Sequence, residues 1–155
     1  MSTLRIAGGE ITLPTGLIKN VTIASDAAID TTKVKQMYKK GTNFNTAIGS
    51  APTNREEIVH VCNSSGTLKG FHAILNVTGS TTDIDFDIKI NGVSALSALL
   101  NFTNTDSDAV PKDGSLSTTA VTVDDVISIE VAVTTSTGAQ GAYAWVDIEE
   151  DNAPT

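Results

Sequence analysis

The sequence has a single cysteine and no apolar run long enough to span a bilayer. Cys62 therefore has no partner for a disulfide within the chain, and stability must come from packing or from oligomerisation. We interpret Cys62 as a small buried apolar residue in a strand. No stretch approaches the ~20 consecutive apolar residues of a membrane helix. Polar residues, glycines and Pro14 interrupt the first 30 residues, where a secretory signal needs an unbroken apolar segment. We therefore expect synthesis in the cytoplasm and no membrane partner.

Aromatic and charged residues are also scarce, at 5% and 18% of the chain. Threonine, serine, alanine and valine take their place, which is typical of β-sheet proteins rather than of charged helical ones. A length of 155 residues suits one compact domain with an appendage. The net charge of −8 argues against nucleic acid as a partner, because phosphate binding needs concentrated lysine and arginine.

The charge is unevenly distributed along the chain. Residues 1–80 carry a net charge of +3, whereas residues 81–155 carry −11. This division indicates a weakly basic leader followed by an acidic module, an organisation that favours a structural or binding protein over a catalyst.

Residues 1–54 are expected to form an extended arm, a short helix and a linker. Apolar residues up to Ile29 are spread too thinly to close a core, and Pro14 removes a backbone donor, which favours an arm or an edge strand. Asp30 can cap a short helix from Thr31 to Lys40. The helix would place Val34, Met37 and Tyr38 on one face. The surrounding lysines are either a solvated face or a docking surface for an acidic neighbour: Lys33, Lys35, Lys39 and Lys40.

Residues 55–155 alternate between apolar and polar side chains with the period of β-strands. The clearest strand places Ile84, Phe86, Ile88 and Ile90 on one face and ends at Asn91-Gly92, a two-residue hairpin signature. Val93 to Phe102 can pair back across this hairpin, although Leu99-Leu100 also permits a short helix. Further strands are expected over residues 57–62, 67–78, 115–123, 126–134 and 142–149. This pattern predicts an all-β fold, an antiparallel β-sandwich or jelly roll.

No catalytic motif stands out, and we predict no enzyme activity, no cofactor and no metal site. The sequence lacks the Gly-x-Ser-x-Gly elbow of serine hydrolases. Asp83, Asp85 and Asp87 lie on one side of a flat strand, which does not curl oxygens around Ca²⁺, so we interpret them as a solvated face. Loop acids are the alternative Ca²⁺ ligands: Asp106, Asp108 and Asp113. His60 and His72 are interpreted as structural residues, because zinc would require further ligands.

Tyr143 and Trp145 form an exposed aromatic pair if Val146 and Ile148 point inward. Such a pair fills a subunit contact in an oligomer, or stacks on sugar rings in a glycan-binding module. The subunit contact is the preferred interpretation, since one tryptophan and one tyrosine make a small sugar platform.

Two segments of the leader, residues 13–23 (LPTGLIKNVTI) and 27–34 (AAIDTTKV), resemble the leader of tailed-bacteriophage virion proteins. In head decoration and head-fibre proteins of this kind, a similar phrase precedes a β domain. The resemblance covers about a fifth of the chain, and Val34 stands where the family usually has leucine. It implies a capsid decoration or cement protein on the outer surface of the virion. The alternative is a receptor- or glycan-binding module of a fibre or adhesin.

The resemblance also implies partners. Residues 1–54 would bind the major capsid protein, and residues 55–155 would project outward as a β-sandwich, in a homotrimer. The arm residues expected to contact the capsid are Ile11, Leu13, Pro14, Ile18, Val21, Ile23, Ile29, Lys33 and Val34.

Overall fold

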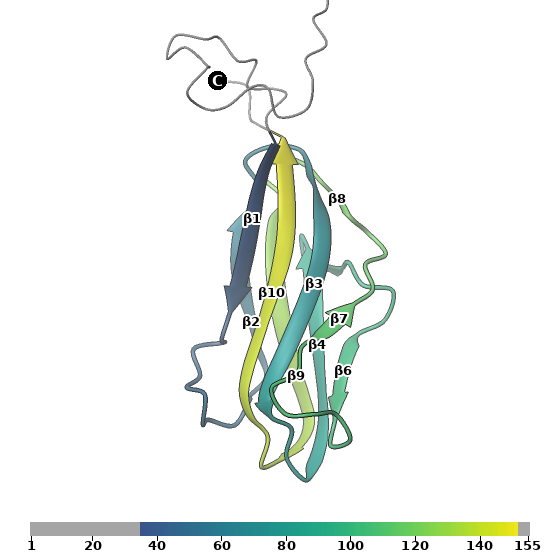
Figure 1. Cartoon of the computed structure of the whole chain (residues 1–155). Coiled ribbons are helices and arrows are strands. Elements are labelled where there is room, and N and C mark those ends of the chain that lie inside the picture. The colour runs from purple at the N-terminus through teal and green to yellow at the C-terminus, as the bar shows by residue number, and fades with distance from the viewer. Residues whose placement is uncertain (1–34, 152–155) are drawn as a thin grey trace, which may run out of the picture. The chain divides into compact units, whose positions relative to one another are not determined.

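The computed structural model describes residues 35–151, which fold into two antiparallel β-sheets (Figure 1). These residues form strands, turns and bends and contain no helix, and so no helix able to cross a membrane. The expectation of an all-β sandwich is confirmed for this part of the chain.

Each sheet has five strands. Sheet A has the order β1-β10-β3-β7, with β8 also paired to β3. Its strands are β1 (Lys35–Thr42), β3 (Gly66–Val77), β7 (Lys112–Gly114), β8 (Ala120–Val121) and β10 (Gln140–Asp151). Sheet B has the order β2-β9-β4-β5, with β6 also paired to β4. Its strands are β2 (Arg55–Val61), β4 (Thr81–Ile90), β5 (Val93–Ser94), β6 (Leu100–Thr103) and β9 (Val126–Thr137).

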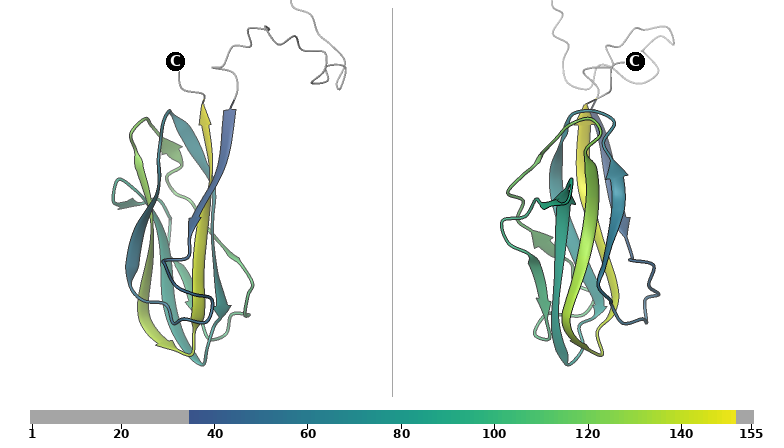
Figure 2. Two further views of the ribbon diagram at one scale, coloured as in Figure 1. Left: turned by 90° about the vertical axis from the view of Figure 1, so that its left-hand side faces the viewer. Right: turned by 180° about the vertical axis from the view of Figure 1, so that it is seen from behind.

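The chain passes repeatedly from one sheet to the other. Strands β1, β3, β7 and β10 lie in sheet A, and the intervening β2, β4, β6 and β9 lie in sheet B. The side view in Figure 2 separates these two layers, with β1 at the edge of one and β2 at the edge of the other.

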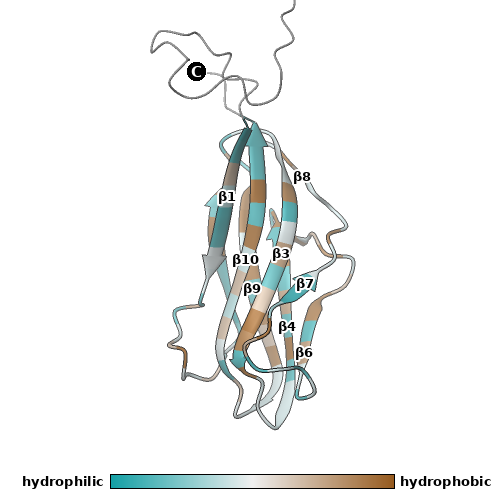
Figure 3. Cartoon of the chain, in the orientation of Figure 1, coloured by the Kyte–Doolittle hydropathy of each residue, from teal (hydrophilic) through white to brown (hydrophobic). Residues whose placement is uncertain are grey.

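The core lies between the sheets and is built from alternating positions of the long strands. In β10 the inward residues Ala144, Val146 and Ile148 are completely buried, and in β4 the same holds for Ile84 and Phe86. Bands of opposite hydropathy along β10 make this alternation visible (Figure 3). The inward faces predicted for residues 84–88 and 127–131 are therefore confirmed. Ile90 and Val133 are half-buried at the margin of the core.

The hairpin predicted at Asn91-Gly92 is present. Both residues have positive φ, 52° and 79°, which these two residue types adopt more readily than others. Beyond this turn, β5 and β6 both pair with β4, and Leu99-Leu100 forms no helix.

The helix predicted from Thr31 to Lys40 is wrong for its described part, because residues 35–42 form β1. Lysines of β1 face the acidic strand β10: Lys35 Nζ lies 2.6 Å from Glu149 Oε1, and Lys39 Nζ lies 3.6 Å from Asp147 Oδ1. Pairing with β10 along eight residues outweighs the weak helical pattern. The sandwich thus includes β1, whose first residue lies twenty residues before the expected boundary at residue 55.

The strand expected over residues 115–123 is also mostly wrong. Only Ala120–Val121 is a strand there, together with an isolated bridge between Leu116 and Leu96. Backbone groups in this segment bond instead to scattered neighbours, such as Ser117 N to Ala95 O. The alternating apolar and polar residues of this segment therefore belong to a connection along the sandwich, not to a long strand.

Candidate functional site

Four connections gather at one end of the sandwich, which we call the distal end. Residues 43–54, 78–80 and 138–139 adjoin β1, β3, β4, β9 or β10 at this end, and residues 104–111 follow Thr103 of β6, which pairs with Asp83 of β4. The opposite end, the proximal end, holds the first residue of β1 and the last residue of β10, since Lys35 pairs with Asp151 (Figure 1).

A pocket of about 440 Å³ opens at the distal end, between the first connection and β10. Its lining residues are uncharged, and most are small: Asn43, Thr46, Ala47, Ile48, Gly141, Ala142 and Tyr143. Gly141 N donates to Ser50 O at 3.0 Å, which holds the connection against β10. Ile48 remains 72% exposed, so the rim of the pocket is apolar.

An aromatic row crosses the outer face of sheet A beside this pocket. The ring centroid of Trp145 lies 5.6 Å from that of Tyr143 and 5.0 Å from that of His72, both in stacked arrangements. Lys39 Nζ lies 5.4 Å from the Trp145 ring centroid, a cation–π contact. The outward orientation predicted for Tyr143 and Trp145 is confirmed.

Tyr143 is the more accessible member of the pair. It is 39% exposed and lines the pocket. Trp145 is held by three neighbours, and its Nε1 is buried with no hydrogen-bond partner among the described residues. A surface ligand would therefore reach Tyr143 before Trp145.

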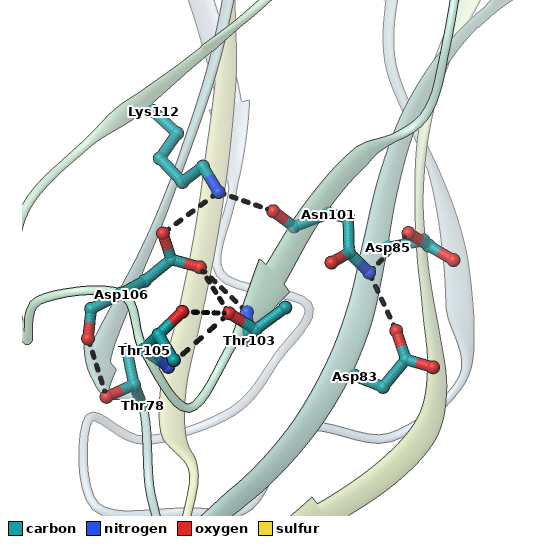
Figure 4. Close-up of polar contacts among 8 residues, drawn as sticks. All are labelled: Thr78, Asp83, Asp85, Asn101, Thr103, Thr105, Asp106 and Lys112. Carbon is teal, nitrogen blue, oxygen red and sulfur yellow. Dashed lines mark hydrogen bonds and ion pairs between the residues drawn. The ribbon is translucent and has the colours of Figure 1, made fainter.

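The three aspartates of β4 lie on the outer face of sheet B, and their carboxylates accept hydrogen bonds from other side chains of the same chain. Asn101 Nδ2 donates to Asp83 Oδ1 at 2.7 Å and to Asp85 Oδ1 at 2.9 Å (Figure 4). Ser94 Oγ donates to Asp87 Oδ1 at 2.7 Å. Asp87 is buried, and this burial raises the pKa of its carboxyl group. The predicted solvated face is thus wrong for Asp87.

The acids of the 104–111 connection and its flanks have separate partners and form no common ligand group. Lys112 Nζ donates to Asp106 Oδ1 at 3.0 Å, and the Thr103 amide donates to Asp106 Oδ2 at 2.7 Å (Figure 4). Asp108 Oδ1 accepts from the Thr78 amide at 2.7 Å, and Asp113 Oδ1 lies 2.6 Å from His72 Nδ1. These contacts hold the connection in place.

One group of potential metal ligands does converge in the described part of the chain: His60, Cys62 and Glu150. One ligand atom from each lies within 4.8 Å of the others, and His60 Nε2 is 2.7 Å from Glu150 Oε1. Burial, with Glu150 as a second cause, raises the pKa of the Cys62 thiol to about 12. The prediction that Cys62 is buried is confirmed, and His60 has a partner that the sequence analysis missed.

Glu150 could have been found from the strand pattern. Residues 142, 144, 146 and 148 face inward, and continuing this alternation places residue 150 in the same row. The last strand predicted from the sequence ended at residue 149 and therefore left Glu150 out. The capsid-contact residues predicted between Ile11 and Val34 lie outside the described residues, so that prediction stays open.

Comparison of the chain with protein-family models and with curated proteins found no match.

Proposed function

We propose that this chain is a structural protein of a tailed-phage virion, a decoration or cement protein of the capsid surface. Its first 34 residues bind the outer shell, and the sandwich of residues 35–151 projects from it. The leader's resemblance to phage virion proteins supports the virion assignment. The structural observation that supports this assignment is the strand order of the sandwich.

This order supports a jelly-roll interpretation of the sandwich. Four strands of one sheet alternate along the chain with four of the other, and β10 lies between β1 and β3 while β9 lies between β2 and β4. Such interleaved sheets are the jelly-roll arrangement of two Greek keys, which recurs in viral capsid and lectin domains. Because a fold alone does not specify function, the proposal also needs a means of attachment.

Attachment through the leader agrees with the position of the proximal end. Lys35 and Asp151 are paired at that end, so the residues preceding Lys35 join the sandwich opposite the distal connections. The proposal is that the proximal end faces the capsid, which would leave the pocket and Tyr143 at the far end of the sandwich.

The proposed homotrimer would cover the edge of the sandwich formed by β1 and β2, each of which pairs with a described strand on one side only. Among the described strands, sheet A ends at β1 and sheet B at β2. Three side chains of these strands are exposed apolar groups: Met37, Ile58 and Val61. Closed symmetry removes exposed strand edges and apolar patches from solvent. Native mass spectrometry should detect trimers, and a strict monomer at micromolar concentration contradicts this part of the proposal.

Co-sedimentation with expanded capsids tests the anchoring arm. The full chain should sediment with capsids, whereas residues 31–155, which retain β1, should stay in solution with an unchanged circular dichroism spectrum. A full-length variant with Ile18, Val21 and Ile23 replaced by serine should also fail to bind. Its control is Val110→Ser, an exposed apolar residue of the distal 104–111 connection, which should bind normally. Full coating by residues 31–155 would refute the anchoring role.

Glycan recognition is a second candidate function, and the aromatic row beside the pocket favours it. An exposed Tyr143 at the pocket rim is a surface on which a sugar ring can stack. On a glycan array, Tyr143→Ala should abolish retention, while Val93→Ala, at the proximal end, should not. Binding that is unaffected by Tyr143→Ala, or absent from the unaltered chain, eliminates this candidate.

A further inference from the structure

We propose that His60, Cys62 and Glu150 form a binding site for one divalent transition-metal ion, with Zn²⁺ as the preferred ion. The site joins the two sheets at the proximal end, because His60 lies in β2 of sheet B and Glu150 in β10 of sheet A. Cys62 follows β2 directly.

The spacing of the three ligand atoms is close to the spacing of ligands around a tetrahedral zinc ion. Zinc lies about 2.0–2.3 Å from nitrogen, oxygen and sulfur ligands, so tetrahedral ligands are roughly 3.3–3.7 Å apart. One ligand atom of each residue lies within 4.8 Å of the other two, and His60 Nε2 is 2.7 Å from Glu150 Oε1. Binding thus requires that this pair separate by about 0.6 to 1 Å, and a pair at the 4.8 Å limit would have to approach by about 1 Å.

The local structure fixes the ligands in this arrangement. Cys62 is hydrogen-bonded through both backbone groups to the turn before β9: its N donates to Asp125 O at 2.9 Å, and its O accepts from Asp124 N at 2.8 Å. A bulge in β2 between Ile58 and His60 shifts the register of the strand. The Tyr38 ring packs on the His60 ring with centroids 5.4 Å apart. The ligands are therefore supported by neighbouring elements.

The ligand chemistry selects the class of ion. A thiolate, an imidazole and a carboxylate suit Zn²⁺ or Co²⁺, whereas Ca²⁺ and Mg²⁺ prefer sites made of oxygen alone. Glu150 and Cys62 are each 1% exposed, and the His60 side chain is 8% exposed. Three protein ligands leave one position for water or another donor.

Glu150 interrupts an apolar row, which is the second observation in favour of a site. The preceding inward residues of β10 are alanine, valine and isoleucine, and an apolar residue at position 150 would continue the core. A buried carboxylate is costly unless strong partners compensate it. A divalent cation held between two sheets would also stabilise a chain whose single cysteine excludes an internal disulfide.

Cobalt titration of the full chain tests the site directly. The protein is first treated with a chelator and kept reduced with a phosphine that does not bind metals. Co²⁺ should bind at one ion per chain and produce a thiolate-to-cobalt charge-transfer band in the near ultraviolet. Zn²⁺ should displace the bound Co²⁺, and the zinc-loaded protein should melt several degrees above the metal-free protein.

Variants assign the ligands. Cys62→Ser should remove the charge-transfer band, and Glu150→Gln and His60→Gln should each weaken Co²⁺ binding by about 100-fold or more. The control is His72→Gln, which alters the histidine beside Asp113 and Asp147 on the outer face and should leave the band intact. If Cys62→Ser does not fold, X-ray absorption of the zinc-loaded unaltered protein should show one sulfur ligand with nitrogen and oxygen ligands. The proposal would be overturned if the chain bound no stoichiometric Co²⁺, if the band survived Cys62→Ser, or if the zinc spectrum showed no sulfur ligand. The three residues would then form a buried hydrogen-bond network only.

Discussion

His60 Nε2 lies 2.7 Å from Glu150 Oε1, and this contact joins the two sheets, whose edge strands β1 and β2 do not pair with each other through the backbone. Both side chains are almost completely buried, with 8% and 2% of their side-chain surface exposed. A polar contact therefore occupies the proximal end of a largely apolar core.

Removing the Glu150 carboxylate should destabilise the fold even without metal. Glu150→Ala leaves the buried His60 ring without its acceptor, which costs roughly 2 to 4 kcal/mol in the free energy of unfolding. Glu149→Ala is the matched control, because Glu149 has the same chemistry one residue earlier but faces outward beside Lys35 and Lys69. Glu149→Ala should lower the free energy of unfolding by only a small fraction of the loss caused by Glu150→Ala. Urea denaturation in chelator measures both, and equal losses contradict the assigned role of Glu150.

The Cys62 thiol should be unreactive in the folded protein. It is buried, and a pKa raised to about 12 by burial leaves almost no thiolate at pH 8. A thiol reagent such as dithionitrobenzoate should modify less than one-tenth of the chains in native buffer and all of them in urea. Rapid modification under native conditions contradicts both the burial and the pKa direction.

Asp106 should contribute stability that depends on pH. Burial opposes its ionisation, but the Thr103 amide and the Lys112 ammonium outweigh it, so the pKa of the carboxyl group is lowered. A lowered pKa in the folded state gives stability that is present above about pH 4 and is lost as the pH falls. Asp106→Ala should therefore cost about 1 to 2 kcal/mol at pH 7 and less at pH 3.

Chemical denaturation at both pH values measures this difference. Asp124→Asn, a change in an exposed turn where asparagine tolerates the positive φ of 67°, should have no comparable effect. A loss for Asp106→Ala that is the same at pH 3 and pH 7 would contradict the electrostatic explanation.

Gly41 should be intolerant of even one added methyl group. A Cβ at this position would lie 2.6 Å from Ala144 O and 2.7 Å from Tyr143 Oη. Gly41→Ala should cost roughly 1 to 3 kcal/mol through overpacking and should change the fluorescence of Trp145, the only tryptophan. Gly49→Ala is the control, because a Cβ there meets no atom within 4 Å. Similar melting temperatures for the two variants would contradict the close packing of β1 on the aromatic row.

Strong local patterns made much of the sandwich predictable from sequence. Alternation placed Ile84 and Phe86 in the core, and Asn91-Gly92 marked a hairpin because both residues tolerate positive φ. The alternation of β10 also placed Trp145 on the outer face. These features depend on residues that are neighbours in the chain.

Features that depend on distant pairing were not predictable in the same way. The segment of β1 has a helical apolar pattern, and its strand forms because β10 offers a complementary acidic edge more than 100 residues later. The convergence of His60 and Glu150 similarly requires knowledge of which strands face each other. For Glu150 the signal was present in the alternation, but the predicted strand ended at residue 149, one residue too early.

Cryo-electron microscopy of expanded capsids mixed with the full chain tests the central proposal most directly. The proposal requires that the capsids come from the phage whose genome encodes the chain. We predict threefold-symmetric density on the outer shell, with the proximal end of each sandwich nearest the capsid and the 43–54 connection outermost. Capsids that remain bare at saturating protein, or sandwiches seated on the shell through their distal ends, would contradict the proposal.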